Sequence, residues 1–296
     1  MHKFLGSVLL LTFVLVVGFA VFVFAQNGQG LAGLSEGSLS DYYHSLIGTI
    51  TGNWQGYGQL FTTLQGQWFW KAFLIIIIAV PGVFLLHYLV IGAKHFDHDG
   101  EQILFFPLYA RVVHFIAALS FSLLAVSGLM MVLGTYLGGG TLIRFARYVH
   151  IGAAMVFVLP AVLMLIMWFK DMLPQLHDIA WMFMLGGYLS KEKKPVPAGK
   201  YNAGQKMYFW LVTAGGVVMA YTGYIIWGMG SAALDTVRLY TIIHNILGMG
   251  ILAFYLTHVY MSVFAIAGSL NSMKTGYKPK EEVDILHSRY KYEQVV

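Results

Sequence analysis

Apolar runs separated by polar connections organise this sequence. Five internal runs are each about 20 residues or longer, the length that an α-helix needs to cross the roughly 30 Å hydrocarbon core of a membrane. A sixth apolar run stands at the N-terminus. The pattern therefore predicts membrane-spanning helices over residues 72–91, 107–137, 142–169, 207–229 and 238–265.

The N-terminal run is typical of a secretory signal. A short basic start precedes an apolar core, and Ala25 ends a small-residue cleavage site. The same run is long enough to stay in the membrane as an anchor. The segment that follows contains no Lys or Arg up to residue 70, as expected of a translocated segment. We expect a signal peptide or anchor at 1–25, a periplasmic segment at 26–70, an extra transmembrane helix at 71–92, a membrane domain at 104–270 and a cytoplasmic tail at 271–296.

Composition supports an all-α integral membrane protein. The chain is 58% hydrophobic and 10% charged, against about 25% charged residues in an average soluble domain. It contains no cysteine, which excludes disulfides, cysteine-ligated iron–sulfur clusters and the covalent attachment of c-type haem. The net charge of +5 is small and lies mainly between the apolar runs, so it indicates membrane topology rather than nucleic-acid binding.

The positive charges predict the orientation. Most Lys and Arg residues lie in the connection 171–206 and in the tail after Ser272, so both are expected on the cytoplasmic side of a bacterial inner membrane. The C-terminus is then cytoplasmic and the mature N-terminus periplasmic. Arg144, Arg147 and Arg238 lie at the opposite boundary, against the simple rule, and need another role there.

Histidines within the apolar runs carry the candidate chemistry. His244 and His258 share the last run, and their spacing of fourteen residues places them on the same face of a helix, about 21 Å apart along its axis. Given the predicted orientation, His150 has the depth of His244, and His114 has the depth of His258. Each of two membrane levels therefore holds two histidines.

Two imidazoles at one depth are what a six-coordinate haem iron needs, because each face of the macrocycle takes one axial nitrogen. We predict two haem b groups, one held by His150 and His244 and the other by His114 and His258. Arg111 and Arg147 each precede a predicted ligand by one helical turn, where they could pair with a haem propionate. Boundary snorkelling is the alternative role for both arginines.

The other histidines are expected to have different roles. A lone membrane histidine is usually a hydrogen-bonded packing residue, which is the role expected for His87 because it has no partner at the other level. The remaining six lie in termini or connections, where solvated roles are expected; they are His2, His44, His95, His98, His177 and His287.

The stretch from Ala198 to Trp210 reads AGKYNAGQKMYFW. Together with the two R-x-x-H pairs and the helix with fourteen-residue histidine spacing, it resembles the cytochrome b (gamma) subunit of membrane-bound respiratory formate dehydrogenases over residues 104–275. The resemblance implies a four-helix dihaem cytochrome b bundle, here with one extra N-terminal transmembrane helix. It also implies an iron–sulfur beta subunit that delivers electrons and a molybdenum or tungsten alpha subunit that oxidises formate.

The same resemblance implies a quinone, menaquinone or ubiquinone, as electron acceptor near His258. The family's quinone pocket corresponds here to Asn202 and Gly204, with Tyr201 and Gln205 as weaker candidates. A quinone carbonyl needs a hydrogen-bond donor, and its reduction needs protons from the adjacent aqueous side. Asn202 could instead, or in addition, cap a helix that begins near Ala203.

Two other functions fit the pattern. The histidine spacing alone also resembles that of the cytochrome b subunits of nickel–iron hydrogenases, and the same electron-transfer role could belong to a hydrogenase or a thiosulfate reductase complex. A membrane anchor or transporter without a cofactor would also be apolar, but it would not need histidines matched in depth.

Overall fold

The computed structural model describes residues 56–292 together with Val14 and Val295. The predicted signal peptide and most of the predicted periplasmic segment lie outside the described residues. Within them, five helices are long and apolar enough to span a membrane, as predicted. They are the continuous helix from Gly58 to Val90 (α3 Gly58–Thr63, a π-helical stretch Leu64–Trp68 and α4 Phe69–Val90), α5 Leu108–Val132, α6 Gly140–Trp168, α8 Ala203–Trp227 and α9 Leu234–Val263.

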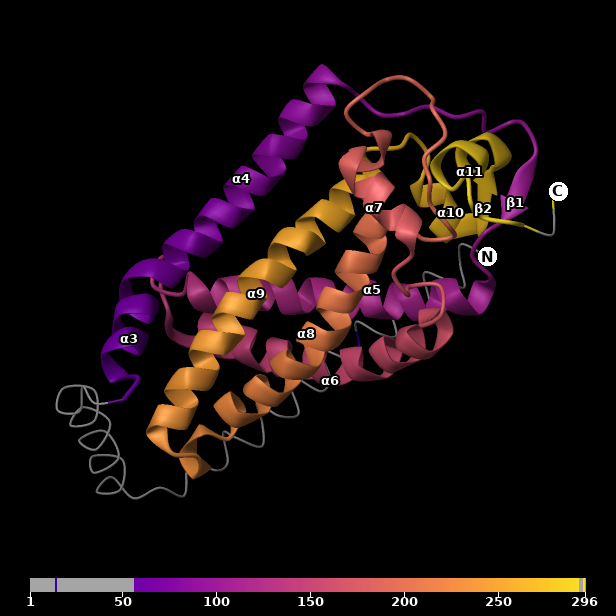
Figure 1. Cartoon of the computed structure of the whole chain (residues 1–296). Helices are drawn as coiled ribbons and strands as arrows, with labels where there is room; N and C mark the ends of the chain where they lie inside the picture. Colours follow the sequence, from indigo (N-terminus) through magenta and orange to yellow (C-terminus); the bar gives the residue numbers. More distant parts are fainter. Residues whose placement is uncertain (1–13, 15–55, 293–294, 296) are drawn as a thin grey trace, which may run out of the picture.

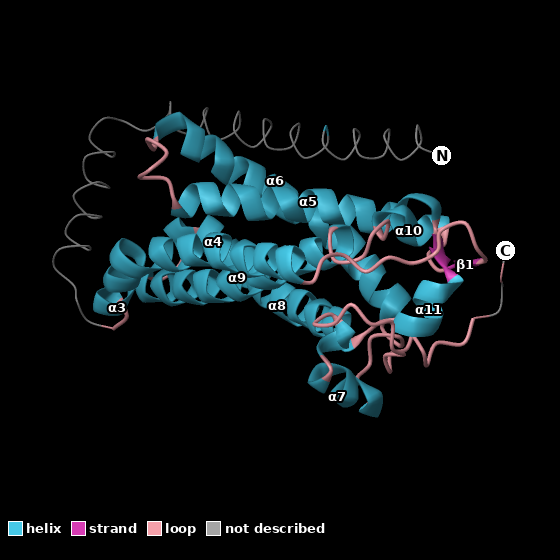
Figure 2. Cartoon of the chain, turned by 90° about the horizontal axis from the view of Figure 1, so that it is seen from above, coloured by secondary structure: helices cyan, strands magenta, loops and turns pink. Residues whose placement is uncertain are grey.

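Four of these helices form two hairpins (Figures 1 and 2). The α5–α6 turn contains Gly138 and Gly139 at positive φ, 81° and 62°, a conformation that glycine adopts without steric cost. The 3₁₀ turn Met229–Ser231 joins α8 to α9. Helices pack closely within each hairpin and only sparsely between hairpins. This four-helix arrangement and one extra helix confirm the predicted fold class.

The extra helix packs against α9. Phe69 and Phe73 of α4 form a buried cluster with Ile242 and Leu252, and α4 lies alongside α9 in Figure 1. Its helical backbone begins at Gly58, well before the predicted start at residue 71. Hydropathy marks only the part of a helix that crosses the bilayer, whereas glutamine-containing turns continue the helix beyond it because glutamine is a good helix former.

The C-terminal segment is folded, although the sequence predicts it as a tail. β1 Gln102–Leu104 pairs antiparallel with β2 Tyr277–Pro279, and two short helices, α10 Leu270–Thr275 and α11 Lys280–Leu286, flank β2. Ile103, Phe105 and Val283 are at most 1% exposed. We call residues 91–107, 188–202 and 264–292 the terminal unit. It forms because apolar residues on one face of α11 are covered by chain segments far away in sequence.

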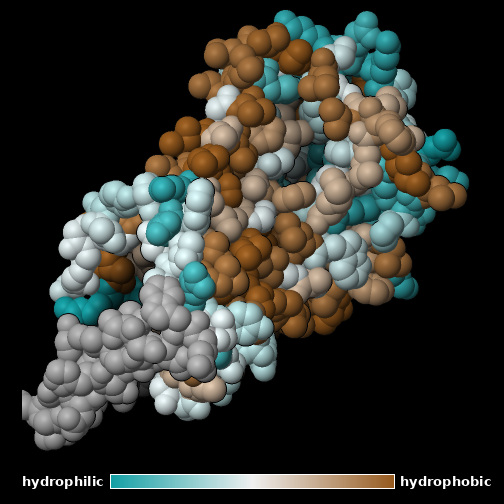
Figure 3. Space-filling view, turned by 60° about the vertical axis from the view of Figure 1, so that its left-hand side comes forward, coloured by the Kyte–Doolittle hydropathy of each residue, from teal (hydrophilic) through white to brown (hydrophobic). Residues whose placement is uncertain are grey.

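The spanning helices expose large apolar side chains on their outer faces. Leu89 of α4 and Ile166 of α6 are 72% and 71% exposed, which fits hydrocarbon contact rather than water. On the face in Figure 3, apolar side chains form broad patches and most hydrophilic ones gather toward the ends. The protein is therefore a multi-pass membrane protein.

Candidate functional site

The structure brings together both predicted histidine pairs. The ring centres of His114 on α5 and His258 on α9 are 6.2 Å apart, and those of His150 on α6 and His244 on α9 are 6.3 Å apart. A metal–imidazole bond of about 2 Å on each side, with about 1 Å from nitrogen to ring centre, requires roughly 6 Å. Both separations therefore suit one metal ion between two imidazoles.

The surroundings of the pairs suit a flat macrocycle rather than a compact metal centre. All four imidazoles are only half-buried, so protein atoms do not close off the space around them. No group of three or more His, Asp or Glu side chains comes together in the part of the chain that the structure describes. Two nitrogen ligands per site match the axial requirement of a haem iron, whose other four ligands belong to the macrocycle.

Hydrogen bonds fix the ring orientation of His150. Its Nδ1 lies 3.1 Å from the Leu124 carbonyl oxygen and 3.1 Å from Ser127 Oγ. The Ser127 hydroxyl donates to the Leu123 carbonyl at 2.5 Å. A carbonyl only accepts, so Nδ1 carries the proton, and Nε2 keeps the lone pair that a metal requires.

His244 is held in the same way. Its Nδ1 lies 2.8 Å from Thr222 Oγ1, and that hydroxyl donates to the Val218 carbonyl at 2.8 Å. The hydroxyl has one proton, so it accepts from His244 Nδ1–H, and Nε2 is again the free ligand atom. Both rings of this level are thus anchored by the neighbouring helix of their own hairpin.

A glycine follows each of the two hydroxyl residues. A Cβ at Gly128 would lie 3.3 Å from His150 Cε1, and a Cβ at Gly223 would lie 3.5 Å from His244 Cε1. The missing side chains let each ring lie directly against the adjacent helix. The dipeptides Ser127-Gly128 and Thr222-Gly223 are a sequence signal for this level that the spacing of histidines alone does not reveal.

The second level is supported by aromatic rings. Tyr208 stacks on His258, with ring centres 4.8 Å apart and planes at 23°. Trp168 lies 6.5 Å from His114. His114 Nδ1 is buried without a hydrogen-bond partner among the described residues. The rings of this level are therefore held by packing, and the structure shows no hydrogen bond from either imidazole to another described residue.

The predicted propionate-binding arginines differ in their contacts. Arg111 is 4% exposed, and its Nη1 donates to the Lys274 carbonyl at 2.6 Å, so it ties α5 to the terminal unit. Arg147 is exposed and lines a shallow hollow with Gly139 and Ile143. Of the two, Arg147 has the freer approach to an anionic group.

The Tyr201–Gln205 motif forms the start of α8. Asn202 Oδ1 accepts from Gln205 N, and Gln205 Oε1 accepts from Asn202 N, both at 2.9 Å. This capping box confirms a helix start at Ala203. Tyr201 is 3% exposed, and burial raises the pKa of its hydroxyl well above the ordinary value. A Cβ at Gly204 would lie 3.0 Å from Trp181.

The motif and the second histidine pair lie at the same end of the bundle. The Trp168 ring is 5.6 Å from that of Tyr201 and 6.5 Å from that of His114, while Tyr208 reaches His258 from the first turns of α8. Behind the motif, Lys206 Nζ pairs with Asp178 Oδ2 at 2.8 Å. Asp178 belongs to α7 Leu176–Phe183, so this ion pair fastens α7 to the start of α8.

His87 and His287, which lie outside the two pairs, also have hydrogen-bond partners. His87 Nδ1 lies 2.6 Å from the Tyr260 hydroxyl, and its Nε2 lies 2.8 Å from the Tyr188 carbonyl oxygen, as expected of a packing residue. The prediction of a solvated His287 is wrong. This residue is 3% exposed and its Nδ1 lies 2.9 Å from the Gly199 carbonyl oxygen, because the terminal unit closes over it. The sequence did not predict that His287 contacts Gly199, which lies two residues before the Tyr201–Gln205 motif.

Comparison with known proteins identifies the family of this chain. The model of the prokaryotic cytochrome b561 family matches residues 106–276. The cytochrome b556(Fdn) subunit of the nitrate-inducible formate dehydrogenase of Escherichia coli K12 is 29% identical over 188 residues, covering 61% of this chain and 86% of that subunit. The E. coli cytochrome b556(fdo) subunit is 25% identical over 180 residues, 56% and 81% of the two chains. The formate dehydrogenase cytochrome b556 subunit of Haemophilus influenzae is 24% identical over 157 residues, which cover 52% of this chain and 66% of that subunit.

These matches confirm the resemblance found in the sequence, with formate dehydrogenase cytochrome b subunits as distant homologues. The matched segment contains the four paired histidines, and the family implies b-type haem. The chain therefore belongs to the prokaryotic cytochrome b561 family and is a membrane electron-transfer subunit of that type.

Proposed function

We propose that this chain is the electron-transfer subunit of a formate dehydrogenase complex and passes electrons across the membrane to a quinone. The observation that carries the proposal is that two histidines of α9 each face a histidine of another helix, His114 of α5 or His150 of α6, with ring centres 6.2 and 6.3 Å apart. Fourteen residues separate the levels along α9, about 21 Å of helix. The formate dehydrogenase relatives favour this complex over a hydrogenase or thiosulfate reductase.

Four side chains would hold the cofactor. His150 and His244 would bind one haem b, and His114 and His258 a second. When bound, each haem supplies a centre that accepts and releases one electron. Ser127 and Thr222 hold the rings of the first pair with Nε2 available, and Tyr208 orients the ring of His258. Arg147 would contact a haem propionate, and Arg111 would either contact a propionate or stabilise the end of α5 through its bond to the Lys274 carbonyl.

A quinone would bind beside Asn202 and Gly204, with Tyr201 and Gln205 nearby. The capping box uses the side-chain oxygens of Asn202 and Gln205, which leaves their amide N–H groups able to donate to a quinone carbonyl. Capping and binding are thus compatible. The buried Tyr201 hydroxyl has no partner among the described residues and offers a further donor on this side.

The proposed direction runs from the periplasm to the cytoplasm. A molybdenum or tungsten alpha subunit oxidises formate to carbon dioxide, one proton and two electrons on the periplasmic side. An iron–sulfur beta subunit delivers the electrons at the His150/His244 level. They leave at the His114/His258 level, where a quinone takes two electrons and two cytoplasmic protons to become a quinol. The lysine-rich terminal unit would lie in the cytoplasm of a bacterial cell.

The test uses the isolated native complex. Formate addition should produce a reduced-minus-oxidised spectrum of two b-type haems per copy of this chain, and a quinone analogue should reoxidise both. Reduction of the haems by hydrogen, or reoxidation of reduced haems by thiosulfate, with no response to formate, would assign the chain to a different complex. A purified chain without haem absorbance would contradict electron transfer altogether.

A further inference from the structure

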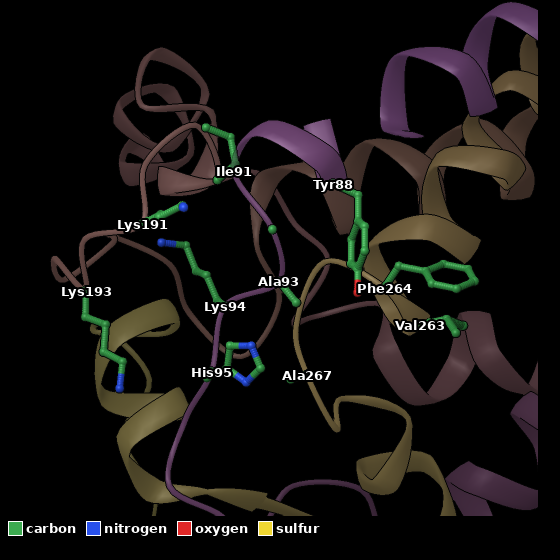
Figure 4. Close-up of a pocket in the computed structure, with 11 residues that line it drawn as sticks. Tyr88, Ile91, Ala93, Lys94, His95, Lys191, Lys193, Val263, Phe264 and Ala267 are labelled. Carbon is green, nitrogen blue, oxygen red and sulfur yellow. The ribbon is translucent and has the colours of Figure 1, made fainter. Parts of the chain in front are cut away.

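A basic hollow lies between the membrane helices and the terminal unit. Its volume is about 680 Å³, within the range of small-molecule binding sites. Tyr88 of α4 and Ile91 just after that helix line one side, and Val263 of α9 and Phe264 just after that helix line another. Polar lining comes from Lys94, His95, Lys191 and Lys193 (Figure 4). We call this the lysine hollow. It is separate from both histidine pairs.

A buried ammonium group faces this hollow. Lys94 is 7% exposed, and its Nζ donates to the carbonyl oxygens of Ser190 at 2.8 Å and Glu192 at 3.0 Å. No carboxylate lies within ion-pair distance of it in the part of the chain that the structure describes. Burial lowers the pKa of Lys94. A buried cation whose only partners are neutral carbonyls leaves room for an anion.

The other charges strengthen the positive field. The amine of Lys191 points toward that of Lys94 in Figure 4, and Lys191 forms no ion pair among the described residues. Lys193 points away and pairs with Glu281 at 2.7 Å, and Glu192 is engaged with Lys194. Glu281 and Glu192 are therefore paired with lysines outside the Lys94–Lys191 pair, whereas the ammonium groups of Lys94 and Lys191 share the polar side of the hollow with His95.

The other wall of the hollow is apolar and belongs to the membrane helices. Tyr88 is 45% exposed, Val263 is 39% exposed and Phe264 is 52% exposed. α4 and α9 end at Val90 and Val263, so this wall marks the edge of the hydrocarbon core. An inorganic anion would use only the polar half of such a site. A ligand with an anionic head and hydrocarbon chains matches both halves.

We propose that the lysine hollow binds an acidic phospholipid. Its phosphate lies between Lys94 and Lys191, and its acyl chains follow Tyr88, Val263 and Phe264 into the bilayer. The backbone of Lys94 already connects the segment after α4 to the segment after α9, since Lys94 N donates to Ala265 O at 2.9 Å and Ala267 N donates to Lys94 O at 2.8 Å. The bound lipid would add contacts that hold the ends of α4 and α9 together. Residues 88–95 lie outside the family match, so the site depends on the extra helix.

Native mass spectrometry of the detergent-purified full-length chain tests the proposal. Phosphatidylglycerol and phosphatidylcholine with the same acyl chains are titrated in parallel. We expect one phosphatidylglycerol to stay bound where phosphatidylcholine is lost. Lys191→Gln should weaken phosphatidylglycerol binding about fivefold, the effect of one basic residue near an anionic headgroup. Lys194→Gln is the matched control, because Lys194 is exposed but outside the lining, and it should bind as the unaltered chain does.

Four results would overturn the proposal. Equal retention of the two lipids would remove the role of charge. Equal weakening by Lys191→Gln and Lys194→Gln would indicate diffuse attraction to a basic surface. Displacement of the lipid by millimolar inorganic phosphate, or occupation of this face by a second copy of the chain without lipid, would assign the hollow to a different occupant.

Discussion

The two histidine levels are similar in spacing but differ in how their rings are held. At the His150/His244 level, both Nδ1 atoms have hydrogen-bond partners on the neighbouring helix, and glycines bring that helix close. At the His114/His258 level, packing against Tyr208 and Trp168 replaces those bonds. One level is built entirely within the helical hairpins, whereas the other borders the terminal unit.

The difference has an electronic consequence. An imidazole that donates from Nδ1–H is a more basic ligand through Nε2, and a more basic ligand favours the oxidised metal. We therefore expect a lower reduction potential at the His150/His244 level than at the His114/His258 level. Electrons would then move energetically downhill toward the Tyr201–Gln205 motif, as the proposed function requires.

The largest effect is expected from removing one ligand at each level. His244→Ala should lose the haem of one level and His258→Ala that of the other, so each variant should keep about half of the haem per polypeptide. Haem absorbance against protein amount in purified membranes measures this. His87→Ala is the control, because His87 pairs with Tyr260 and Tyr188, and it should retain both haems. Full haem content in all of these variants would contradict ligation by the pairs.

A smaller effect is expected from filling the space beside one ring. Gly223→Val would place branched carbon atoms against His244, whose Cε1 is 3.5 Å from the position of a Cβ. Most of the haem at the His150/His244 level should be lost, with the other level intact. Gly216→Val changes the same helix where a Cβ meets nothing within 4 Å, so it should keep both haems. If the two valine variants behave alike, the glycine is not part of the site.

Removal of one hydrogen bond should change a potential without loss of haem. Thr222→Val keeps the shape of the side chain but removes the acceptor for His244 Nδ1–H. Redox titration should show one haem shifted upward by a few tens of millivolts and the other unchanged. Thr257→Val is the control, since that hydroxyl bonds only the Ala253 carbonyl of its own helix. A shift of both haems would deny the assignment of Thr222 to one level.

The smallest effect is expected from lowering the pH, which should reduce the local stability of the terminal unit. Burial and the charge of Lys278 lower the pKa of His287 to about 3, below its ordinary value of about 6.5 in an unfolded chain. Above pH 6.5 the histidine is neutral in both the folded and the unfolded chain, so it does not oppose folding. As the pH falls from 6.5 toward 3, only the unfolded chain takes up a proton on this histidine, and the free energy of unfolding decreases. Local stability of the terminal unit should drop by about 2 kcal/mol between pH 7 and pH 5.

Hydrogen exchange at the two pH values, corrected for intrinsic rates, measures this loss. Peptides from residues 196–199 and 277–289 should exchange faster at pH 5, while those around Thr222 and His244 should not. His287→Gln retains a donor for the Gly199 carbonyl but cannot take up a proton, so it should abolish the pH dependence. Equal acid sensitivity with glutamine would place its origin elsewhere.

The sequence alone determined the membrane class, the five spans and the four matched histidines. Hydropathy and helical rise are local properties, and they fix both the number of crossings and the depth of each residue. Depth is sufficient to pair His150 with His244 and His114 with His258 before any contact is known. The sequence also contains the motif that carries the family resemblance, and Asn202 as a cap residue predicts the helix start at Ala203.

Only the tertiary structure decided what lies beside each ring. Thr222 and Ser127 contact their histidines across a hairpin, at positions that no periodicity within one helix specifies. His287 is buried because α11 packs on the Gly199 segment, and Lys94 becomes a buried cation because the 188–192 segment covers it. Such contacts depend on which faces meet after helices and loops pack together. A linear pattern of apolar and polar residues defines those faces but not their partners.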